Sequence, residues 1–258
     1  MKGFSTAWRL LTQISIFGGE LEQPHKSMIW FPLVGLILGL LSYGLLGVLS
    51  PIFTSQITAL FLIVFSVWVT RGLHLDGLAD LADGVYSGKN RPGMLEVMKD
   101  PRLGTFGVVS LVLILLVKWQ LLALVLGFER GFVLLGLVGL FSLSRFGQGW
   151  MAARFDYARA AGTGKGFIGG ATNKDGLKMC LVVVGMSYYF HSQFLFLALA
   201  VILFVEFFGR SLTNRLGGVT GDCLGATSEL SEVLVLLAVI ILQHLQFVGS
   251  PIFALIWN

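Results

Sequence analysis

Three aspartates in the first third of the chain have the spacing of a single helical face. Asp76, Asp80 and Asp83 follow the pattern i, i+4, i+7. At about 100° per residue, a helix places them near roughly 0°, 40° and 340°, which forms one narrow stripe. His74 falls on the opposite side, together with the leucines of the same segment. The pattern therefore predicts a helix with one acidic face and one apolar face.

Carboxylates arranged in this way repel one another unless a cation lies between them. Oxygen-only ligands suit a hard cation, above all Mg²⁺, which commonly joins a few carboxylates to substrate phosphates. The alternative is a solvated acidic face, but the stripe has no lysine four residues after any of its aspartates and is flanked by glycines. We expect Asp76, Asp80 and Asp83 to bind Mg²⁺.

A second acidic patch lies near the C-terminus. Asp222 is preceded by Gly221 and followed by Gly225, which would allow close approach to a metal or a phosphate. Glu229 lies seven residues after Asp222 and would share its face on a continuous helix. We expect Asp222 to complete a centre of one or two metals. The alternative is that Asp222 caps the last helix, with Glu229 and Glu232 in its first turns.

The composition indicates an integral membrane protein. Of the 258 residues, 55% are hydrophobic and only 12% are charged, whereas ordinary soluble domains carry about 25% charged residues. The net charge of +4 does not indicate nucleic-acid binding, because the basic residues are dispersed and no aromatic–basic module accompanies them. We expect one all-α domain over residues 1–258, a polytopic helical bundle with about 6–8 spans.

The apolar runs alternate with polar segments. Residues 1–28 read as an interfacial amphipathic segment. The expected spans cover about 29–50, 57–70, 104–127, 132–144, 179–190, 194–209 and 233–257. The last of these is either one helix or a hairpin broken near 243–246, and Lys118 is placed near the far end of its span, where it could snorkel.

Three long polar segments, 71–103, 145–178 and 210–232, carry most of the charge. Together with the N-terminus they hold sixteen of the eighteen lysines and arginines. The positive-inside rule therefore places all of them in the cytoplasm, where they would form the active site. Candidates for phosphate binding within them are Lys99, Arg102, Arg145, Lys165 and Arg215. The glycine-rich piece around Lys165 lacks the phosphate-binding-loop pattern, and Arg145 could equally anchor the end of a span.

Three ordered stretches resemble the signature blocks of the cobalamin-5′-phosphate synthase family, also called adenosylcobinamide-GDP ribazoletransferases. They are GLHLDGLADLADG (72–84), MKDPRLGTFG (98–107) and GGVTGDCLGA (217–226), and a fourth stretch, FPLVGLILG (31–39), resembles the first span of that family. One departure is Leu81, where the family more often has a small polar residue, and it falls on the non-acidic face. The resemblance covers most of the chain, from about 30 to 232.

The resemblance implies an Mg²⁺-dependent transferase in the prokaryotic inner membrane, with membrane lipid around it and an oligomeric state, such as a homo-oligomer, left open. Its substrates would be adenosylcobinamide-GDP and α-ribazole or α-ribazole 5′-phosphate, with GMP as the leaving group. Asp76, Asp80, Asp83 and Asp222 would hold the metal. Lys99 and Arg102 would steady the departing phosphate. Asp100 or His74 would accept the proton of the attacking hydroxyl, although a histidine packed between helices is the alternative.

Two rival functions are less consistent with the sequence. A CDP-alcohol phosphotransferase would carry an arginine after the first aspartates and a wider carboxylate spacing than the one present here. A cation transporter would place carboxylates in the middle of its spans, whereas only Glu206 interrupts an apolar run.

Overall fold

The computed structural model describes residues 2–17, 24–162, 164–190 and 192–248. That part of the chain is helical, and its only extended pairing is one isolated parallel bridge between Tyr157 and Val219. The expected all-α class is therefore confirmed. The helices are α1 Lys2–Leu11, α2 Pro24–Ser27, the 3₁₀ turn η1 Met28–Trp30, α3 Phe31–Leu49, α4 Ser55–Thr70, α5 Leu73–Val85, α6 Arg91–Val97, α7 Thr105–Val125, α8 Arg130–Arg154, α9 Lys165–Ile168, α10 Asn173–Tyr189, α11 Phe194–Leu216 and α12 Gly221–Val248.

Five helical segments are long and apolar enough to cross a membrane. They comprise α7, α8, α11, most of α12 and the continuous segment His25–Leu49 that ends in α3. The helices α4 and α5 satisfy the same criterion only as a pair. The protein is thus a polytopic helical membrane protein, with five spans or six within the described residues. The predicted count of 6–8 agrees only at its lower limit, because α10 does not qualify and α4 qualifies only together with α5.

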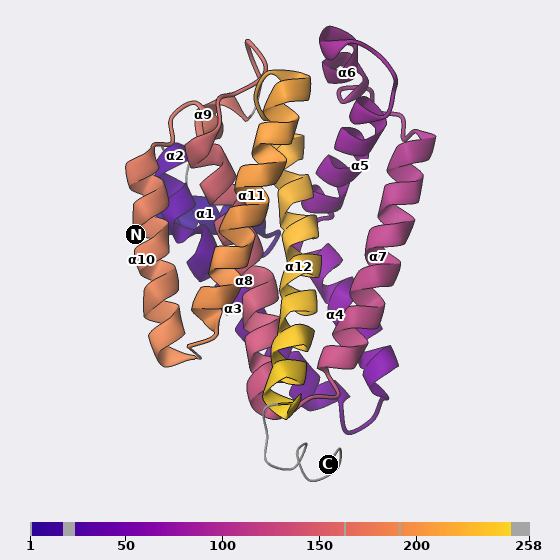
Figure 1. The fold of residues 1–258 in the computed structure, drawn as a ribbon, viewed down its shortest axis with the longest axis vertical. Coiled ribbons are helices and arrows are strands. Elements are labelled where there is room, and N and C mark those ends of the chain that lie inside the picture. The colour runs from indigo at the N-terminus through magenta and orange to yellow at the C-terminus, as the bar shows by residue number, and fades with distance from the viewer. Residues whose placement is uncertain (1, 18–23, 163, 191, 249–258) are drawn as a thin grey trace.

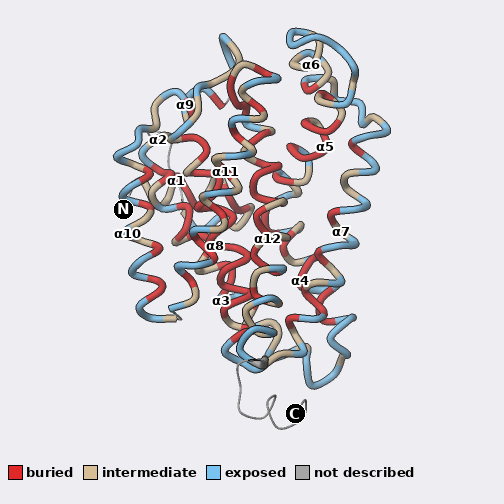
Figure 2. The backbone as a smooth tube through the Cα atoms, viewed as in Figure 1, coloured by how far each residue is buried: buried red, intermediate tan, exposed pale blue. Residues whose placement is uncertain are grey.

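The helix α8 forms the centre of the bundle, against α3 on one side and α12 on another (Figure 1). Between Phe132 and Gly149 every residue of α8 except Leu134 is buried, and Figure 2 shows the buried backbone concentrated along α8 and α12. The longer connections, with α6 and α9, lie at the upper end of Figure 1, and the connections from α3 to α4 and from α7 to α8 lie at the lower end. Two of the three polar segments predicted to be long are therefore long connections, whereas the third, 210–232, is reduced to a short turn between α11 and α12.

The N-terminal helix α1 is amphipathic, as expected. Its apolar side packs on α2, η1 and α3, with Trp8 and Leu11 buried. That side therefore covers protein, and it is not a free face for a bilayer.

A sharp bend separates α4 from α5. Arg71 and Gly72 both adopt left-handed backbone conformations, with φ of 55° and 66°. Their amide groups donate to the carbonyls of Trp68 and Val67, which closes the last turn of α4. The two helices consequently meet at 87°, and α5 is directed toward the start of α12.

Two expected boundaries are wrong. The helix α8 continues past residue 144 to Arg154, so Arg145 lies inside a helix and is fully buried instead of marking the end of a span. Most of the third polar segment is also helical, because α11 extends to Leu216 and α12 begins at Gly221. The final helix is unbroken through 243–246 as far as Val248, and residues 249–258 lie outside the described part of the chain.

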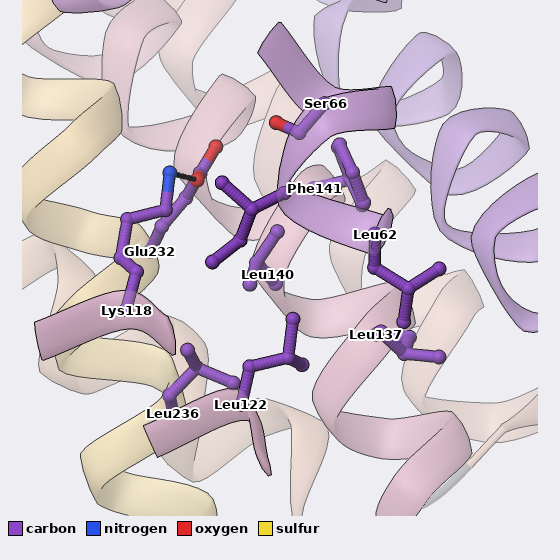
Figure 3. Close-up of a pocket in the computed structure, with 10 residues that line it drawn as sticks. Leu62, Ser66, Lys118, Leu122, Leu137, Leu140, Phe141, Glu232 and Leu236 are labelled. Atoms are coloured by element: carbon purple, nitrogen blue, oxygen red, sulfur yellow. Dashed lines mark ion pairs between the residues drawn. The ribbon is translucent and has the colours of Figure 1, made fainter. Parts of the chain in front are cut away.

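Four charged side chains that neutralise one another inside the bundle explain the errors at the end of α8 and the start of α12. Lys118 Nζ lies 2.9 Å from Glu229 Oε2 and 2.5 Å from Glu232 Oε2, and Arg145 Nη1 lies 2.5 Å from Glu232 Oε1. We call these four residues the ion-pair network. Figure 3 shows Lys118 and Glu232 directed toward each other among the side chains of Leu122, Leu140, Phe141 and others. A hydropathy profile of the sequence counts each of these residues as polar, although in the structure a partner neutralises its charge.

The network corrects three expectations. Lys118 is buried and paired, so it does not snorkel to an interface. Glu229 pairs with Lys118 and so does not extend the acidic patch of Asp222. Charges do occur inside the spans, which removes the premise used above against a transporter, although here they are paired with one another.

Candidate functional site

The site is built where α5 crosses α12, and glycines set the distance between the two helices. A Cβ atom on Gly77 would lie 2.9 Å from the carbonyl oxygen of Asp222 and 3.0 Å from its Cα. A Cβ on Gly225 would lie 3.1 Å from the carbonyl oxygen of His74. The backbones therefore touch, as small residues permit in helical membrane proteins. This contact brings the aspartate stripe of α5 beside Asp222.

Gly77→Ala is expected to destabilise the fold by about 1–3 kcal/mol, the usual cost of forcing a side chain into a packed site. It should also reduce activity, because α5 and α12 would be pushed apart at Asp222. Thermal unfolding in detergent, with turnover measured on the same preparation, would check this. Gly44→Ala is the matched control, since a Cβ there meets nothing within 4 Å. Equal stability of the two variants would contradict the close crossing.

Asp76, Asp80 and Asp222 form what we call the carboxylate centre. Asp76, Asp222 and Asp83 each act electrostatically on Asp80, and Asp76 acts on Asp222. Among the described residues, no hydrogen bond or ion pair reaches the carboxylate of Asp76 or Asp80. The stripe is therefore helical as predicted, its opposite face with His74 is buried, and its negative charge is only partly compensated.

Asp83 has a role that the stripe alone does not predict. Its two carboxylate oxygens accept the backbone N–H groups of Gly104 and Gly107 at 2.7 and 2.8 Å. These residues precede and begin α7, so Asp83 caps the N-terminus of that helix, where a negative charge is favourable. The structure thus turns Asp83 toward α7, away from a shared position with the other two aspartates.

Arg159 is a site residue that sequence analysis does not identify. Its Nη2 donates to Asp222 Oδ2 at 3.1 Å, and Thr220 Oγ1 donates to the same oxygen at 3.2 Å. Arg159 also acts electrostatically on Asp80. A guanidinium therefore stands beside the carboxylate centre, where a cation is expected.

A short pairing of two loops fixes Arg159 in this place. Ala158 N–H donates to the carbonyl of Val219 at 2.9 Å, and Val219 N–H donates to the carbonyl of Asp156 at 2.8 Å. Gly218 permits the approach, with φ of 151° and a hypothetical Cβ only 2.5 Å from the carbonyl oxygen of Asp156. The segment after α8 is thus tied to the turn before α12.

A cavity of about 260 Å³ opens beside the centre, and we call it the inner cavity. Asp76, Asp222, His74 and Gln148 contribute its polar groups, and most of its remaining lining is apolar. The apolar part includes Leu10, Leu11, Met28, Phe31 and Phe167. A largely apolar cleft with a few convergent polar groups is typical of a small-molecule site.

His74 is buried at the wall of this cavity. Its Nδ1 lies 3.4 Å from Arg145 Nη2, and its Nε2 has no hydrogen-bond partner among the described residues. Because a guanidinium can only donate, Nδ1 of a neutral imidazole accepts and the proton resides on Nε2. In this arrangement His74 can donate a hydrogen bond to a ligand, but it does not offer the free lone pair that a general base at Nε2 needs.

The other candidate base, Asp100, is paired in the loop before α7. Arg102 Nε and Nη2 donate to its two carboxylate oxygens at 2.9 and 2.6 Å. These hydrogen bonds lower the pKa of Asp100 to about 2, which makes it a weak proton acceptor. The guanidinium of Arg102 is largely exposed, and Lys99 is exposed beside the same loop.

The remaining predicted phosphate ligands are dispersed. Lys165 Nζ donates to the carbonyl of Ala160 at 2.8 Å, within its own loop. Arg215 is exposed in the last turn of α11. Arg145 is buried in the ion-pair network. Lys99 lines a cavity together with Arg159.

The carboxylate centre has the chemistry of a hard-cation site, with oxygen donors from two helices. As the side chains lie here, no three His, Cys, Asp or Glu residues of the described chain are grouped closely enough to hold a metal. Asp83 is turned to α7, and Asp222 accepts from a guanidinium instead. The donor types fit Mg²⁺, and Arg159 stands in for a cation on one of them.

Comparison with known proteins covers the same segments. Residues 3–240 match the model of a family described as cobalamin-5-phosphate synthase. The chain belongs to the cobalamin-5-phosphate synthase family. An adenosylcobinamide-GDP ribazoletransferase of Prosthecochloris aestuarii is 37% identical over 243 residues, which are 91% of this chain and 96% of that protein. The protein of the same name from Escherichia coli is 38% identical over 229 residues, 86% of this chain and 91% of that protein. No solved structure matches the chain.

Membership in the family confirms the resemblance based on the four stretches. All the residues discussed above lie within the matched region, including both glycines of the crossing and Arg159. Sequence spacing does not point to Arg159, because it lies outside the blocks and 63 residues from Asp222 in the chain. The one sequence signal for it is its position in the polar segment after α8.

Proposed function

We propose that this protein joins adenosylcobinamide-GDP to α-ribazole or α-ribazole 5′-phosphate, giving adenosylcobalamin or its 5′-phosphate and GMP. An oxygen–phosphorus bond forms between the ribazole hydroxyl and the cobinamide-side phosphorus. The bond from that phosphorus to the bridging oxygen breaks, and the bridging oxygen leaves with GMP. The hydroxyl proton is released during the transfer, so that atoms and charge balance.

The observation that carries this proposal is the meeting of two family blocks at one cavity. Asp76 comes from the block at 72–84 and Asp222 from the block at 217–226, and both line the inner cavity. The two relatives named above carry the name ribazoletransferase, and this chain matches them over 96% and 91% of their length. Displacement at a diphosphate depends on positioning and charge neutralisation more than on covalent help, which suits a set of carboxylates beside an apolar pocket.

Asp76, Asp80 and Asp222 would hold Mg²⁺, which would supply charge neutralisation at the diphosphate when bound. The chain's own residues have separate tasks. His74 Nε2–H would orient a ligand in the inner cavity, because this buried N–H has no hydrogen-bond partner in the part of the chain that the structure describes. The apolar lining would exclude water, which would otherwise compete with the ribazole hydroxyl. Asp83 would keep α7 in place behind the centre.

We further propose that the site faces the cytoplasm from a prokaryotic inner membrane. The support is the positive-inside pattern, because the end of the bundle with α6 and α9 carries most lysines and arginines. Cysteine labelling of Ser87 and Ser50 variants in intact cells would test the orientation, since these serines precede α6 and follow α3. Labelling of position 50 but not 87 by an impermeant reagent is expected. The reverse pattern would reject it.

The reaction is tested with purified protein in liposomes, supplied with adenosylcobinamide-GDP and α-ribazole 5′-phosphate. GMP release and a cobalamin product are expected with Mg²⁺ and are expected to disappear with excess EDTA. Restoration by added Mg²⁺ would show that the loss is not denaturation. A folded, metal-supplied protein that releases no GMP would reject the proposed reaction.

A further inference from the structure

A second cavity is lined in part by Arg159. It has a volume of about 290 Å³, and we call it the outer cavity. Lys99, Arg159 and Glu96 supply its charged groups, beside a wall formed by α6 and the segment after α8. Arg159 thus lines the outer cavity while its guanidinium bonds Asp222, which lines the inner one.

The guanidinium of Arg159 has hydrogen-bond donors to spare in this position. Its side chain is about 14% exposed, it makes one hydrogen bond to Asp222, and its Nε is buried without a hydrogen-bond partner among the described residues. A guanidinium has five donors in a planar fork and binds phosphate through two of them at once. A buried donor without a partner carries a free-energy cost that a ligand oxygen would remove.

Asp222 is the proposed ligand of the metal and also the hydrogen-bond partner of Arg159. In this structure it accepts from Arg159, and no three carboxylates are grouped for a metal in the described chain. A metal on Asp222 would meet the positive charge of Arg159 at close range, which is unfavourable while the guanidinium stays there. The metal and Arg159 therefore compete for the carboxylate of Asp222.

Resting on the proposed function, we infer that Arg159 couples the metal to the substrate. A phosphate entering the outer cavity between Arg159 and Lys99 draws the guanidinium away from Asp222, and Asp222 then becomes available to the cation. Without phosphate, Arg159 keeps Asp222 occupied and the metal binds weakly. The centre is consequently completed only when a phosphate-bearing substrate is present, and by linkage the metal strengthens phosphate binding by the same factor.

The test is Mn²⁺ binding, followed as the loss of the free Mn²⁺ signal in electron paramagnetic resonance, with purified protein in detergent. GMP is the phosphate probe, and its own association with Mn²⁺ is subtracted using samples without protein. Wild type should bind Mn²⁺ about tenfold more tightly with GMP, within the range typical of coupled sites. Arg159→Gln should bind Mn²⁺ without GMP about as tightly as wild type does with it, and GMP should add little.

Matched variants make the result specific. Arg154→Gln removes an arginine from the same region that pairs with Glu206, and it should keep the full effect of GMP. Arg159→Lys keeps the charge and should keep part of the coupling. A retained response to GMP in this variant would show that the position tolerates substitution. Asp222→Asn should bind Mn²⁺ weakly with or without GMP. Thermal unfolding of each variant establishes that it is folded.

The coupling is overturned if GMP leaves the Mn²⁺ affinity of wild type unchanged, or if Arg159→Gln responds to GMP as wild type does. If either result accompanies normal Mg²⁺-dependent turnover, the proposed reaction stands and only the coupling fails. If no variant binds Mn²⁺ and turnover does not need a metal, both the coupling and the metal centre fail.

Discussion

Asp80→Asn is expected to lower Mg²⁺-dependent GMP release by about 10²–10³-fold, the scale of removing one preorganised charge-stabilising group from an active site. Asparagine keeps the size of the side chain but removes the negative charge between Asp76 and Asp222. The same charge is repelled by three neighbouring carboxylates, with Asp76 the strongest of them. The substitution should therefore leave the metal-free protein as stable as wild type or more stable. Loss of turnover and retained thermal stability are measured on one preparation.

A fall in activity without a fall in stability distinguishes a charge needed for function from a charge needed for the fold. Asp175→Asn is the matched control, because Asp175 belongs to the capping box of α10 with Thr172. Its hydrogen bonds to Thr172 lower the pKa of Asp175, so the charged form stabilises the fold at neutral pH. The control should lose some stability and keep its activity. An Asp80→Asn protein with full metal-dependent turnover would remove Asp80 from the centre.

The part of the site that could be predicted from sequence is the part coded by local spacing. The interval between Asp76 and Asp80 specifies a shared helical face, and the glycines around Asp222 indicate close backbone approach. Both features depend on residues within one or two helical turns. The pairing of α5 with α12 follows once those glycines are placed together, because Gly77 and Gly225 meet at the crossing.

The rest depends on contacts between distant segments, which periodicity does not encode. Arg159 reaches Asp222 only because Val219 pairs with the segment after α8. The carboxylate of Asp83 turns toward α7 because the N–H groups of Gly104 and Gly107, at the start of that helix, donate to it. An acidic side chain looks the same in sequence whether it awaits a cation, caps a helix or pairs with an arginine, so spacing alone could not separate these roles.

The ion-pair network shows the same limit for the membrane spans. Glu229 and Lys118 are 111 residues apart, and Glu232 and Arg145 are 87 apart. Arg145 ends the apolar run read for α8, and Glu229 and Glu232 delay the one read for α12, so residues 221–232 are expected as a polar segment although they begin α12. Inside the bundle the four charges sum to zero. The position of such charges in a span could be predicted only with knowledge of their partners.

Glu232→Gln is expected to lower the free energy of unfolding by about 3–5 kcal/mol, the cost of removing one partner from a buried ion pair. Glu232 is fully buried and contacts both Lys118 and Arg145. Glutamine would leave one uncompensated positive charge among apolar side chains. The cavity beside the pair measures about 10 Å³, at the lower limit of the roughly 10–15 Å³ that a single water needs, so solvent offers little relief. Unfolding in detergent, by heat or denaturant, measures the change.

Two further variants decide whether charge balance is the cause. Glu206→Gln removes a carboxylate from a partly exposed pair with Arg154 and should cost less than about 1 kcal/mol. Adding Lys118→Met to Glu232→Gln restores neutrality, since Arg145 and Glu229 then remain, and should recover part of the lost stability. With Lys118→Met measured alone, the coupling energy of the pair is the change in the double variant minus the sum of the changes in the two single variants. If the double variant is less stable than Glu232→Gln alone, charge balance is not the cause, because Lys118 would then stabilise the bundle through its pair with Glu229 and its packing by more than its unbalanced charge costs.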